Sequence, residues 1–312
     1  MLDWLTDRIL DALADGERVP PPALLFLLRQ LAAEAAADIA EPLGAALARE
    51  LDLQAHDRCG GNSADWLAVF SEAASISDDP RLTRAAADLL TGVRLSWAQP
   101  SGGPIRLEPD LSQLLNPDST ESWGPPSGGP FRMKPDPTVD NVMHSIEACL
   151  VSINIPEARD LAAEAIDALE RVVADSYRPG LGMAHRRGGS PFVRGGLGDQ
   201  VWSASTLLTA YMLTARLPYA MLADELMQRV IHSPVEEGDD PFALTCDVAR
   251  VFCRLAALHH DDEYRRGAVL AVDTDYVQEA RRTLDRLEPS VRERGVDAAP
   301  FGLALAEWLK VQ

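Results

Sequence analysis

The sequence is poor in lysine and in aromatic residues, and both shortages narrow what the protein can be. Only Lys134 and Lys310 are lysines among 29 basic residues, and 48 acidic residues give a net charge of −19. A chain this acidic repels phosphate backbones and anionic lipid headgroups, so we expect no nucleic-acid partner and no membrane partner. Aromatic residues make up 6% of the chain, but 46% of the residues are apolar, which is enough for a sizeable core.

Cysteine and long apolar runs are also scarce. None of the four cysteines forms a CxxC pair, and the spacing of Cys246 and Cys253 on one expected helix face is typical of core packing. The longest apolar run, Ala23 to Leu28, is far too short to span a membrane. The start of the chain is acidic and lacks the basic region of a secretory signal. These features predict a location in the reducing cytoplasm.

Strand-like alternation is missing as well, apart from a small hairpin expected within Gly180–Phe192. Helical spacing dominates instead. Glu157–Arg171 and Asp275–Glu288 each carry one apolar stripe, which is typical of surface helices. Gln200–Ala215 and Phe242–Leu258 are apolar nearly all round and should be buried. The expected helices, about eleven in number, are 2–15, 22–40, 42–51, 63–76, 80–97, 138–153, 156–174, 198–215, 218–232, 241–260 and 274–310, the last broken near Pro289 to Pro300.

Buried and amphipathic helices alternate along the chain, with short turns at one end and long connections at the other. This is the layout of an α/α toroid, an all-α barrel of the six-hairpin type, whether complete or incomplete. A superhelical array of hairpins is the alternative, but its repeat length would be regular. Here the helices expected to be buried start near Asp65, Asp140, Asp199 and Asp240, at steps of 75, 59 and 41 residues. We therefore predict one toroid domain over residues 1–312, in which helices of residues 1–60 pack on the hairpins of residues 61–312.

One Pro-Gly segment occurs twice, as PSGGPIRLEPD at residues 100–110 and as PSGGPFRMKPD at residues 126–136. We interpret the two copies as corresponding corners of the helical repeat, with Arg106 and Arg132 placed alike. Two roles remain open for them. They are either a pair of arginines at the rim of the funnel or loop-packing devices from a local duplication.

The second half of the chain resembles a known family. Residues 181–231, LGMAHRRGGSPFVRGGLGDQVWSASTLLTAYMLTARLPYAMLADELMQRVI, are similar to the helical C-terminal region of thioredoxin-like proteins related to the spermatogenesis-associated family. That region belongs with the N-acylglucosamine 2-epimerase-like and six-hairpin glycosidase-like toroids. The segments DDPFALTCDVARVFCRLAALHHDDEYRRGA and SGGPFRMKPDPTVDNVMHSIEACL are similar to neighbouring parts of the same region. The resemblance covers residues 100–310 and implies a toroid with a carbohydrate-like ligand.

The chain also departs from this family. The thioredoxin-like domain and its cysteine pair are absent, and only Asp140 and Asn141 match a family stretch rich in His, Phe, Glu and Lys that ends in Asp-Asn. Two functions therefore remain open. One is a toroid that binds or processes a small carbohydrate-like ligand, and the other is a non-catalytic module that binds a protein partner or serves a structural role. The sequence does not decide whether the protein is an enzyme.

Candidate site residues gather at the starts of the expected inner helices and in one basic loop. The aspartates there either cap helix N-termini or surround the mouth of the funnel with carboxylates. A carboxylate four residues before an imidazole, as in Asp140 and His144, tunes it for proton transfer, although such pairs are often structural. The candidate catalytic residues are Asp140, His144 and Asp199. The candidate ligand-binding residues are Asp65, Trp66, Asn141, His185, Arg186, Arg187, Gln200 and Trp202.

Each group has a structural alternative. The tryptophans either offer faces to sugar rings or pack in the core, and the basic residues either attract an anionic ligand or neutralise nearby acids. We expect no metal and no cofactor. The deciding feature would be a cavity. Three or more residues from one set lining an open cavity would favour the carbohydrate function, and an apolar plug would favour the module. That set is Asp65, Asp140, His144, Asp199, Gln200 and His185.

Overall fold

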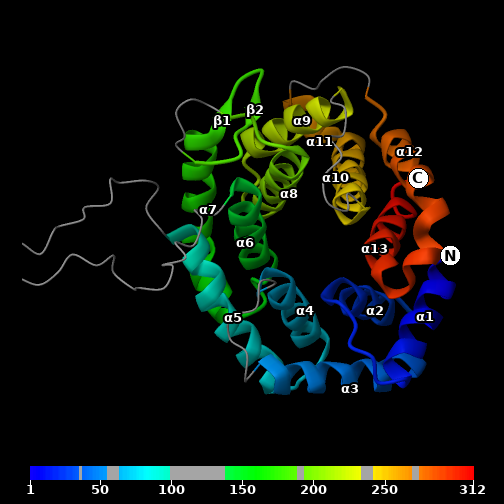
Figure 1. Ribbon diagram of the computed structural model, residues 1–312. Coiled ribbons are helices and arrows are strands. Elements are labelled where there is room, and N and C mark those ends of the chain that lie inside the picture. The colour runs from blue at the N-terminus through cyan, green and yellow to red at the C-terminus, as the bar shows by residue number, and fades with distance from the viewer. Residues whose placement is uncertain (35–36, 55–62, 99–137, 188–192, 233–241, 269–273) are drawn as a thin grey trace, which may run out of the picture.

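Two concentric rings of helices surround a central axis in the computed structural model (Figure 1). The structure describes residues 1–34, 37–54, 63–98, 138–187, 193–232, 242–268 and 274–312. Both PSGGP segments, with Arg106 and Arg132, lie outside these residues, as do Cys59 and Asp240. No described helix is long and apolar enough to cross a membrane.

Six helices form the inner ring. Each contacts the next one along the chain, and the last contacts the first, so the ring is closed (Figure 1). These helices are α2 (Pro21–Glu34), α4 (Ser63–Ile76), α6 (Val139–Val151), α8 (Leu197–Thr214), α10 (Phe242–His260) and α13 (Ala299–Trp308).

The outer ring supplies one long helix beside each inner helix (Figure 1). Its members are α1 (Leu2–Ala14), α3 (Ala37–Gln54), α5 (Pro80–Ala98), α7 (Pro156–Ser176), α9 (Leu217–His232) and α12 (Tyr276–Arg294). Smaller elements complete the fold, namely α11 (Asp262–Gly267), the 3₁₀ helix η2 (Gly295–Ala298) and the hairpin of β1 (Tyr177–Arg178) with β2 (Gly182–Met183). The predicted all-α toroid is confirmed, and helices of residues 1–60 form part of both rings.

The distribution of charge along each helix explains its ring. The α8 helix carries one charged residue, Asp199, and buries side chains on most of its surface, so it lies inside. The α7 helix buries one stripe that includes Ala158, Ala165 and Leu169 and exposes the opposite charged face, so it lies outside. The predicted inner positions of Gln200–Ala215 and Phe242–Leu258 are confirmed, as are the outer positions of Glu157–Arg171 and Asp275–Glu288 (Figure 1).

Two expected helix ends are wrong. We expected a helix to end before Pro42 and another to break from Pro289, but α3 and α12 run through these prolines. Pro289 and Asp285 are both exposed, so the Asp285 carbonyl that loses its N–H partner lies on the face where water can serve as the donor. The break comes at Gly295, whose φ of +57° lies in the left-handed region that favours glycine.

Candidate functional site

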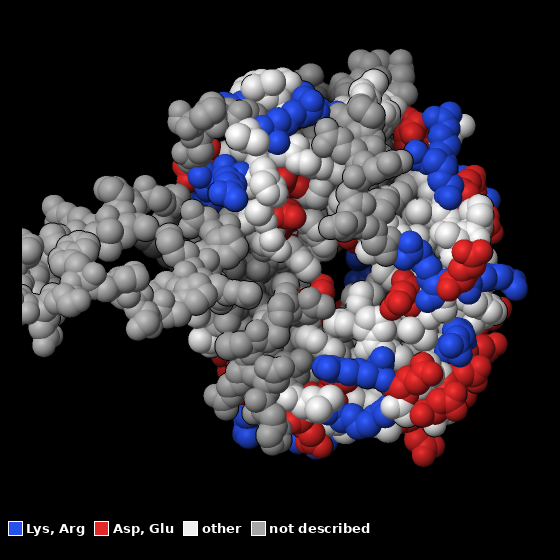
Figure 2. Space-filling view, in the orientation of Figure 1, with Lys and Arg blue, Asp and Glu red and all other residues white. Residues whose placement is uncertain are grey.

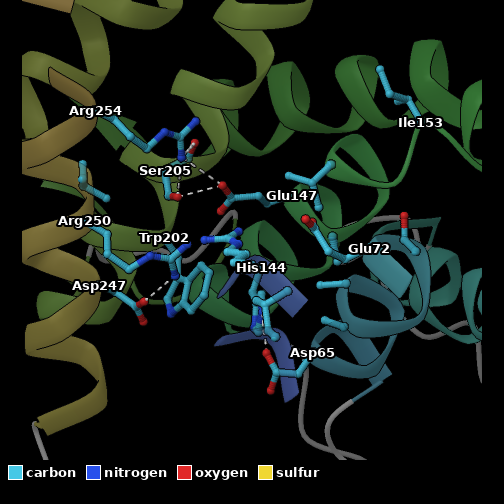
Figure 3. A pocket seen from close by; sticks show the side chains of 18 of the residues that line it. Asp65, Glu72, His144, Glu147, Ile153, Trp202, Ser205, Asp247, Arg250 and Arg254 are labelled. Atoms are coloured by element: carbon cyan, nitrogen blue, oxygen red, sulfur yellow. Dashed lines mark hydrogen bonds and ion pairs between the residues drawn. The ribbon is translucent and has the colours of Figure 1, made fainter. Parts of the chain in front are cut away.

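A cavity of about 320 Å³ lies inside the inner ring. The hollow is visible near the centre of Figure 2, and Figure 3 shows its lining from close by. Five inner helices and the turn after α6 contribute side chains. The polar lining residues are Arg29, Asp65, Ser71, Glu72, Ser75, His144, Glu147, Asn154, Ser205, Asp247, Arg250 and Arg254. The apolar ones, which include Leu25, Val151, Ile153 and Trp202, do not plug the space.

A smaller cavity of about 190 Å³ adjoins it at the N-terminal ends of the inner helices, near Pro21, Ala243 and Pro300. Seven residues line both cavities, and we call these shared residues the waist. The waist consists of Leu25, Asp65, Ala68, His144, Trp202, Asp247 and Arg250. A ligand entering from this end of the ring meets the waist before it reaches the larger cavity.

Three residues from three helices form one contact chain at the waist. The His144 imidazole lies 3.1 Å from the Asp65 carboxylate through Nε2 and stacks on the Trp202 indole, with ring centroids 3.9 Å apart (Figure 3). Burial disfavours protonation of His144, but its hydrogen bond to Asp65 and that carboxylate's charge outweigh burial. The pKa of His144 is therefore raised. When protonated, the His144 imidazole adds a positive charge to the aromatic surface that the half-buried indole gives the waist.

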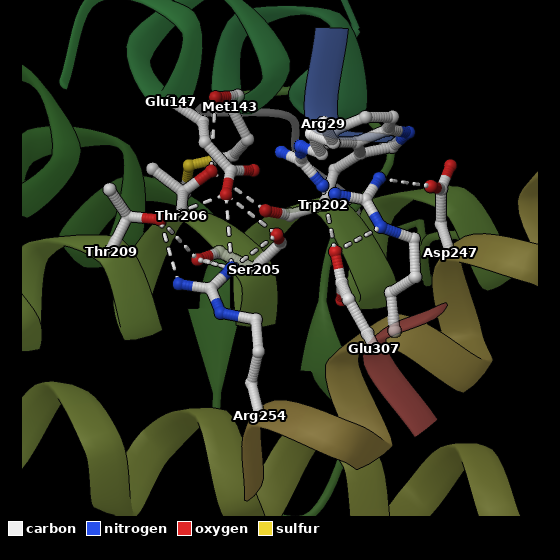
Figure 4. Close-up of polar contacts among 11 residues, drawn as sticks. Arg29, Met143, Glu147, Trp202, Ser205, Thr206, Thr209, Asp247, Arg254 and Glu307 are labelled. Atoms are coloured by element: carbon white, nitrogen blue, oxygen red, sulfur yellow. Dashed lines mark hydrogen bonds and ion pairs between the residues drawn. The ribbon is translucent and has the colours of Figure 1, made fainter. Parts of the chain in front are cut away.

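Ion pairs join the first and last inner helices on the other side of the waist. Arg29 from α2 and Arg250 from α10 both donate to Glu307 Oε1 of α13, each at 3.0 Å (Figure 4). Arg250 also donates to Asp247 Oδ1 at 3.2 Å. Burial raises the pKa of Asp247 to about 6, against the opposing effects of Arg250 and His144. Asp247 can therefore change protonation state near neutral pH.

A second polar network lies deeper in the larger cavity. Glu147 Oε1 on α6 accepts hydrogen bonds from the Ser205 hydroxyl at 2.7 Å, the Thr209 hydroxyl at 2.9 Å and Arg254 at 3.1 Å (Figure 4). Arg254 also donates to both oxygens of Ser205 and to the Thr209 hydroxyl. These bonds fix the orientation of the Glu147 carboxylate.

Asp199, a candidate catalytic residue, lies outside the lining of both cavities. It is 2% exposed, and it accepts hydrogen bonds from the backbone N–H groups of Gly196 and Asp140. Asp199 Oδ2, the oxygen that accepts from Gly196, also lies 3.0 Å from His185 Nδ1. Burial raises the pKa of Asp199. These contacts tie the start of α8 to the start of α6 and to the loop after β2.

Three other candidates have structural contacts. Gln200 forms two hydrogen bonds with the backbone of Met183, so it holds β2. Trp66 is buried and stacks on Phe70, and the Asn141 amide donates to the Thr138 hydroxyl. None of the three candidates lines either cavity.

The basic loop is split in the same way. Arg187 is largely buried and lies 3.5 Å from the Asp175 carboxylate, whereas Arg186 is exposed. Of the six residues in the deciding set, Asp65 and His144 line the larger cavity. Trp202, a candidate outside that set, lines it as well. Neither deciding feature is therefore met, because two residues of the set rather than three line the cavity and apolar side chains do not plug it.

The sequence interpretation missed six charged residues of the larger cavity. All lie on inner helices that are otherwise largely apolar, which is the signal that could have identified them. On α10 the only charges before the last turn are Asp247, Arg250 and Arg254, which follow helical spacing toward one face. The other three are Arg29 on α2, Glu72 on α4 and Glu147 on α6. Among the described residues, no cluster of His, Cys, Asp and Glu is arranged to hold a metal ion.

No family model and no curated protein matches this sequence. Among solved structures, the chain is similar to the GH76A α-1,6-mannanase from Salegentibacter sp. HEL1_6, with a TM-score of 0.56 and 12% identity. The match covers 99% of this chain and 89% of that chain. At this identity the likeness shows the fold alone, which is the six-hairpin glycosidase-like toroid. The narrower resemblance to spermatogenesis-associated thioredoxin-like proteins gains no support from these comparisons.

Proposed function

We propose that the central cavity binds a small carbohydrate-like ligand. The observation that carries the proposal is the waist, where the Trp202 indole lies between hydrogen-bonding groups from several inner helices. Sugar rings present apolar C–H faces and polar edges, and an aromatic surface beside carboxylates and guanidinium groups complements both. The solved toroid with a similar fold is described as an α-1,6-mannanase, which adds support for a carbohydrate.

Processing of the ligand would require a proton donor at the waist. We assign this role to Asp247, because its pKa of about 6 keeps part of it protonated near neutral pH and because it lines both cavities. Asp65 and His144 would then orient the ligand beside Trp202. Asp140 and Asp199 remain predicted catalytic residues, although their contacts place them at the helix ends rather than in the cavity.

The test compares two half-buried tryptophans. Trp202→Leu removes the aromatic wall, whereas Trp308→Leu removes an indole that donates to the Val277 backbone and lies outside both cavities. We expect α-1,6-mannobiose or another neutral disaccharide to raise the melting temperature of the wild type. Calorimetric affinity should fall about fivefold in Trp202→Leu, because a lost aromatic contact costs roughly 1 kcal/mol, and should stay unchanged in Trp308→Leu.

The same samples address the alternative function. Release of monosaccharide from the bound disaccharide, lost in Asp247→Asn, would support an enzyme. Binding without release would support a non-catalytic module that retains the ligand site. If no carbohydrate at millimolar concentration changes the melting temperature or produces heat, the proposal is wrong.

A further inference from the structure

Glu147 has one carboxylate oxygen with three hydrogen bonds and one with none. The residue lines the larger cavity and is 8% exposed. Its Oε1 atom accepts from Ser205, Thr209 and Arg254. Within the described part of the chain, its buried Oε2 atom has no hydrogen-bond partner. Because rotation of the carboxylate would break three bonds, the acceptor Oε2 is held in place.

A buried carboxylate oxygen without a donor has lost its hydration and gained nothing in return. Glu147 lines the cavity, so a donor bound there is the partner that a small displacement of neighbouring side chains would bring to Oε2. Arg254 cannot serve Oε2 from its present position, since one terminal nitrogen bonds to Oε1 and Ser205 and the other to Thr209. The missing partner must be a hydrogen-bond donor.

The rest of this deep compartment, the part of the larger cavity beyond the waist, favours a neutral ligand. Ser71 and Asn154 form a mutually hydrogen-bonded pair in its wall, and Ser75 lies nearby on α4. The Glu72 carboxylate belongs to the same lining. The two arginines that line this compartment are already paired, Arg29 with Glu307 and Arg254 with Glu147. A carboxylate or phosphate entering here would therefore face Glu72 and the acceptor Oε2 of Glu147, and like charges repel strongly in a desolvated site.

Building on the proposed function, we propose that the deep compartment is a subsite for a neutral, hydroxyl-bearing sugar ring. One ring hydroxyl donates to Glu147 Oε2, and a ring that carries a carboxylate or phosphate at this position is rejected. A site built to hydrogen-bond a substrate hydroxyl discriminates strongly, because its buried acceptor stays unpaired with the wrong ligand.

Glu147→Gln tests this subsite through a change of preference. The three donors around Oε1 require an acceptor there, so the new amide should place its oxygen at that position and its NH₂ group where Oε2 was. The acceptor thus becomes a donor. The probes are mannose, mannosamine and mannuronate, which share a ring. Mannosamine carries an ammonium group in place of the 2-hydroxyl, and mannuronate carries a carboxylate in place of the 6-hydroxymethyl group. Wild type should prefer mannose to mannuronate, and in Glu147→Gln we expect mannose to bind about tenfold more weakly and mannuronate more tightly than before.

Glu164→Gln is the matched control, since it makes the same substitution on the outer helix α7, outside both cavities, and leaves the Glu147 network intact. It should leave the affinity for mannose within about twofold of wild type. Thr209→Val removes one donor to Oε1 and should lower stability while keeping the preference for mannose. If Glu147→Gln weakens all three sugars equally, or if wild type prefers mannuronate, Glu147 is only structural and the inference is wrong. Mannosamine distinguishes an ammonium donor from a hydroxyl donor. If mannosamine binds more tightly than mannose, the subsite selects an ammonium group and not a neutral ring.

A second measurement is independent of sugar affinity and of the folding of the variant. Crystals of the wild-type protein soaked in glycerol should show a glycerol hydroxyl within hydrogen-bond distance of Glu147 Oε2. A single water or an unfilled contact at Oε2 would overturn the inference. If sugars bind through Trp202 while Oε2 meets only water, the proposed function stands without this subsite. If glycerol reaches Oε2 while no sugar binds, Oε2 accepts a hydroxyl, but the sugar-ring subsite and the proposed function both fail.

Discussion

Gly302 is the point at which the closing helix α13 approaches the start of the chain. A Cβ atom at this position would lie 2.4 Å from Leu5 Cδ2 and 2.9 Å from Phe26 Cε2. Leu5 on α1 and Phe26 on α2 are both completely buried, so neither side chain has free space to move into. We expect Gly302→Ala to overpack the contact between the first and last helices of the inner ring, at a cost of about 1–3 kcal/mol.

Gly92 provides the matched control. It lies exposed in α5, and a Cβ atom there would meet nothing within 4 Å. Gly92→Ala should stabilise the protein by roughly 0.5–1 kcal/mol, because alanine is the better helix former. This propensity gain is common to both variants, so the difference between their free energies of unfolding isolates the overpacking. Urea unfolding followed by circular dichroism should give a difference of about 1–3 kcal/mol. Equal stabilisation by both substitutions would refute the described closure of the ring.

Two further predictions concern the site and its surroundings. Asp65 raises the pKa of His144 in the folded state, so the folded protein binds this proton more tightly than the unfolded protein does. The resulting contribution to the free energy of unfolding is fully present below the unfolded pKa near 6.5. It is lost as pH rises through the raised folded pKa. Both side chains are partly exposed, so Asp65→Asn should lower the free energy of unfolding by about 0.5–1 kcal/mol at pH 5.5 and have little effect at pH 8.5. An effect in urea titrations that does not depend on pH would contradict the pairing of Asp65 with His144. Asp199→Ala should lower the free energy of unfolding by about 2–4 kcal/mol, because it leaves two backbone N–H groups without their acceptor. Asp140→Ala removes one local acceptor and should lower it by about 1 kcal/mol. Equal losses in chemical denaturation would argue against the central role of Asp199.

The alternation of helices was predictable from the sequence because each ring imposes its own pattern of polarity. Gln200–Ala215 contacts other helices on most of its surface, and Glu157–Arg171 contacts them on one face, so the two segments differ in charge content. The continuation of α12 through Pro289 was not predictable in this way. One missing N–H costs little where the affected carbonyl faces water, and only the tertiary structure shows which face that is.

The site was predicted in part, and the failures have two physical causes. Residues in the first turn of a helix lie beside backbone N–H groups that have no partner within the helix. The Asp199 carboxylate accepts hydrogen bonds from two such groups, the N–H of Gly196 before its own helix and the N–H of Asp140 in α6. It therefore faces the backbone rather than the cavity. Rotation of a helix about its axis is equally invisible in the sequence. Trp66 and Trp202 both lie near the start of an inner helix, yet Trp66 stacks on Phe70 and Trp202 lines the cavity.

Charges within an inner helix carry more information than charges at its start. Beyond the first turn, the backbone donors are already bonded, so a side-chain charge must find its partner across the helix bundle or in the cavity. The face toward the outer ring is packed with apolar side chains, which leaves the face toward the axis. Glu147, Asp247 and Arg254 all follow this rule, and none lies in a first turn. The polar lining of the cavity therefore comes largely from the few interior charges of its inner helices. Among the side-chain atoms of Glu147, Asp247 and Arg254, Oε2 of Glu147 is the buried atom without a hydrogen-bond partner in the described part of the chain.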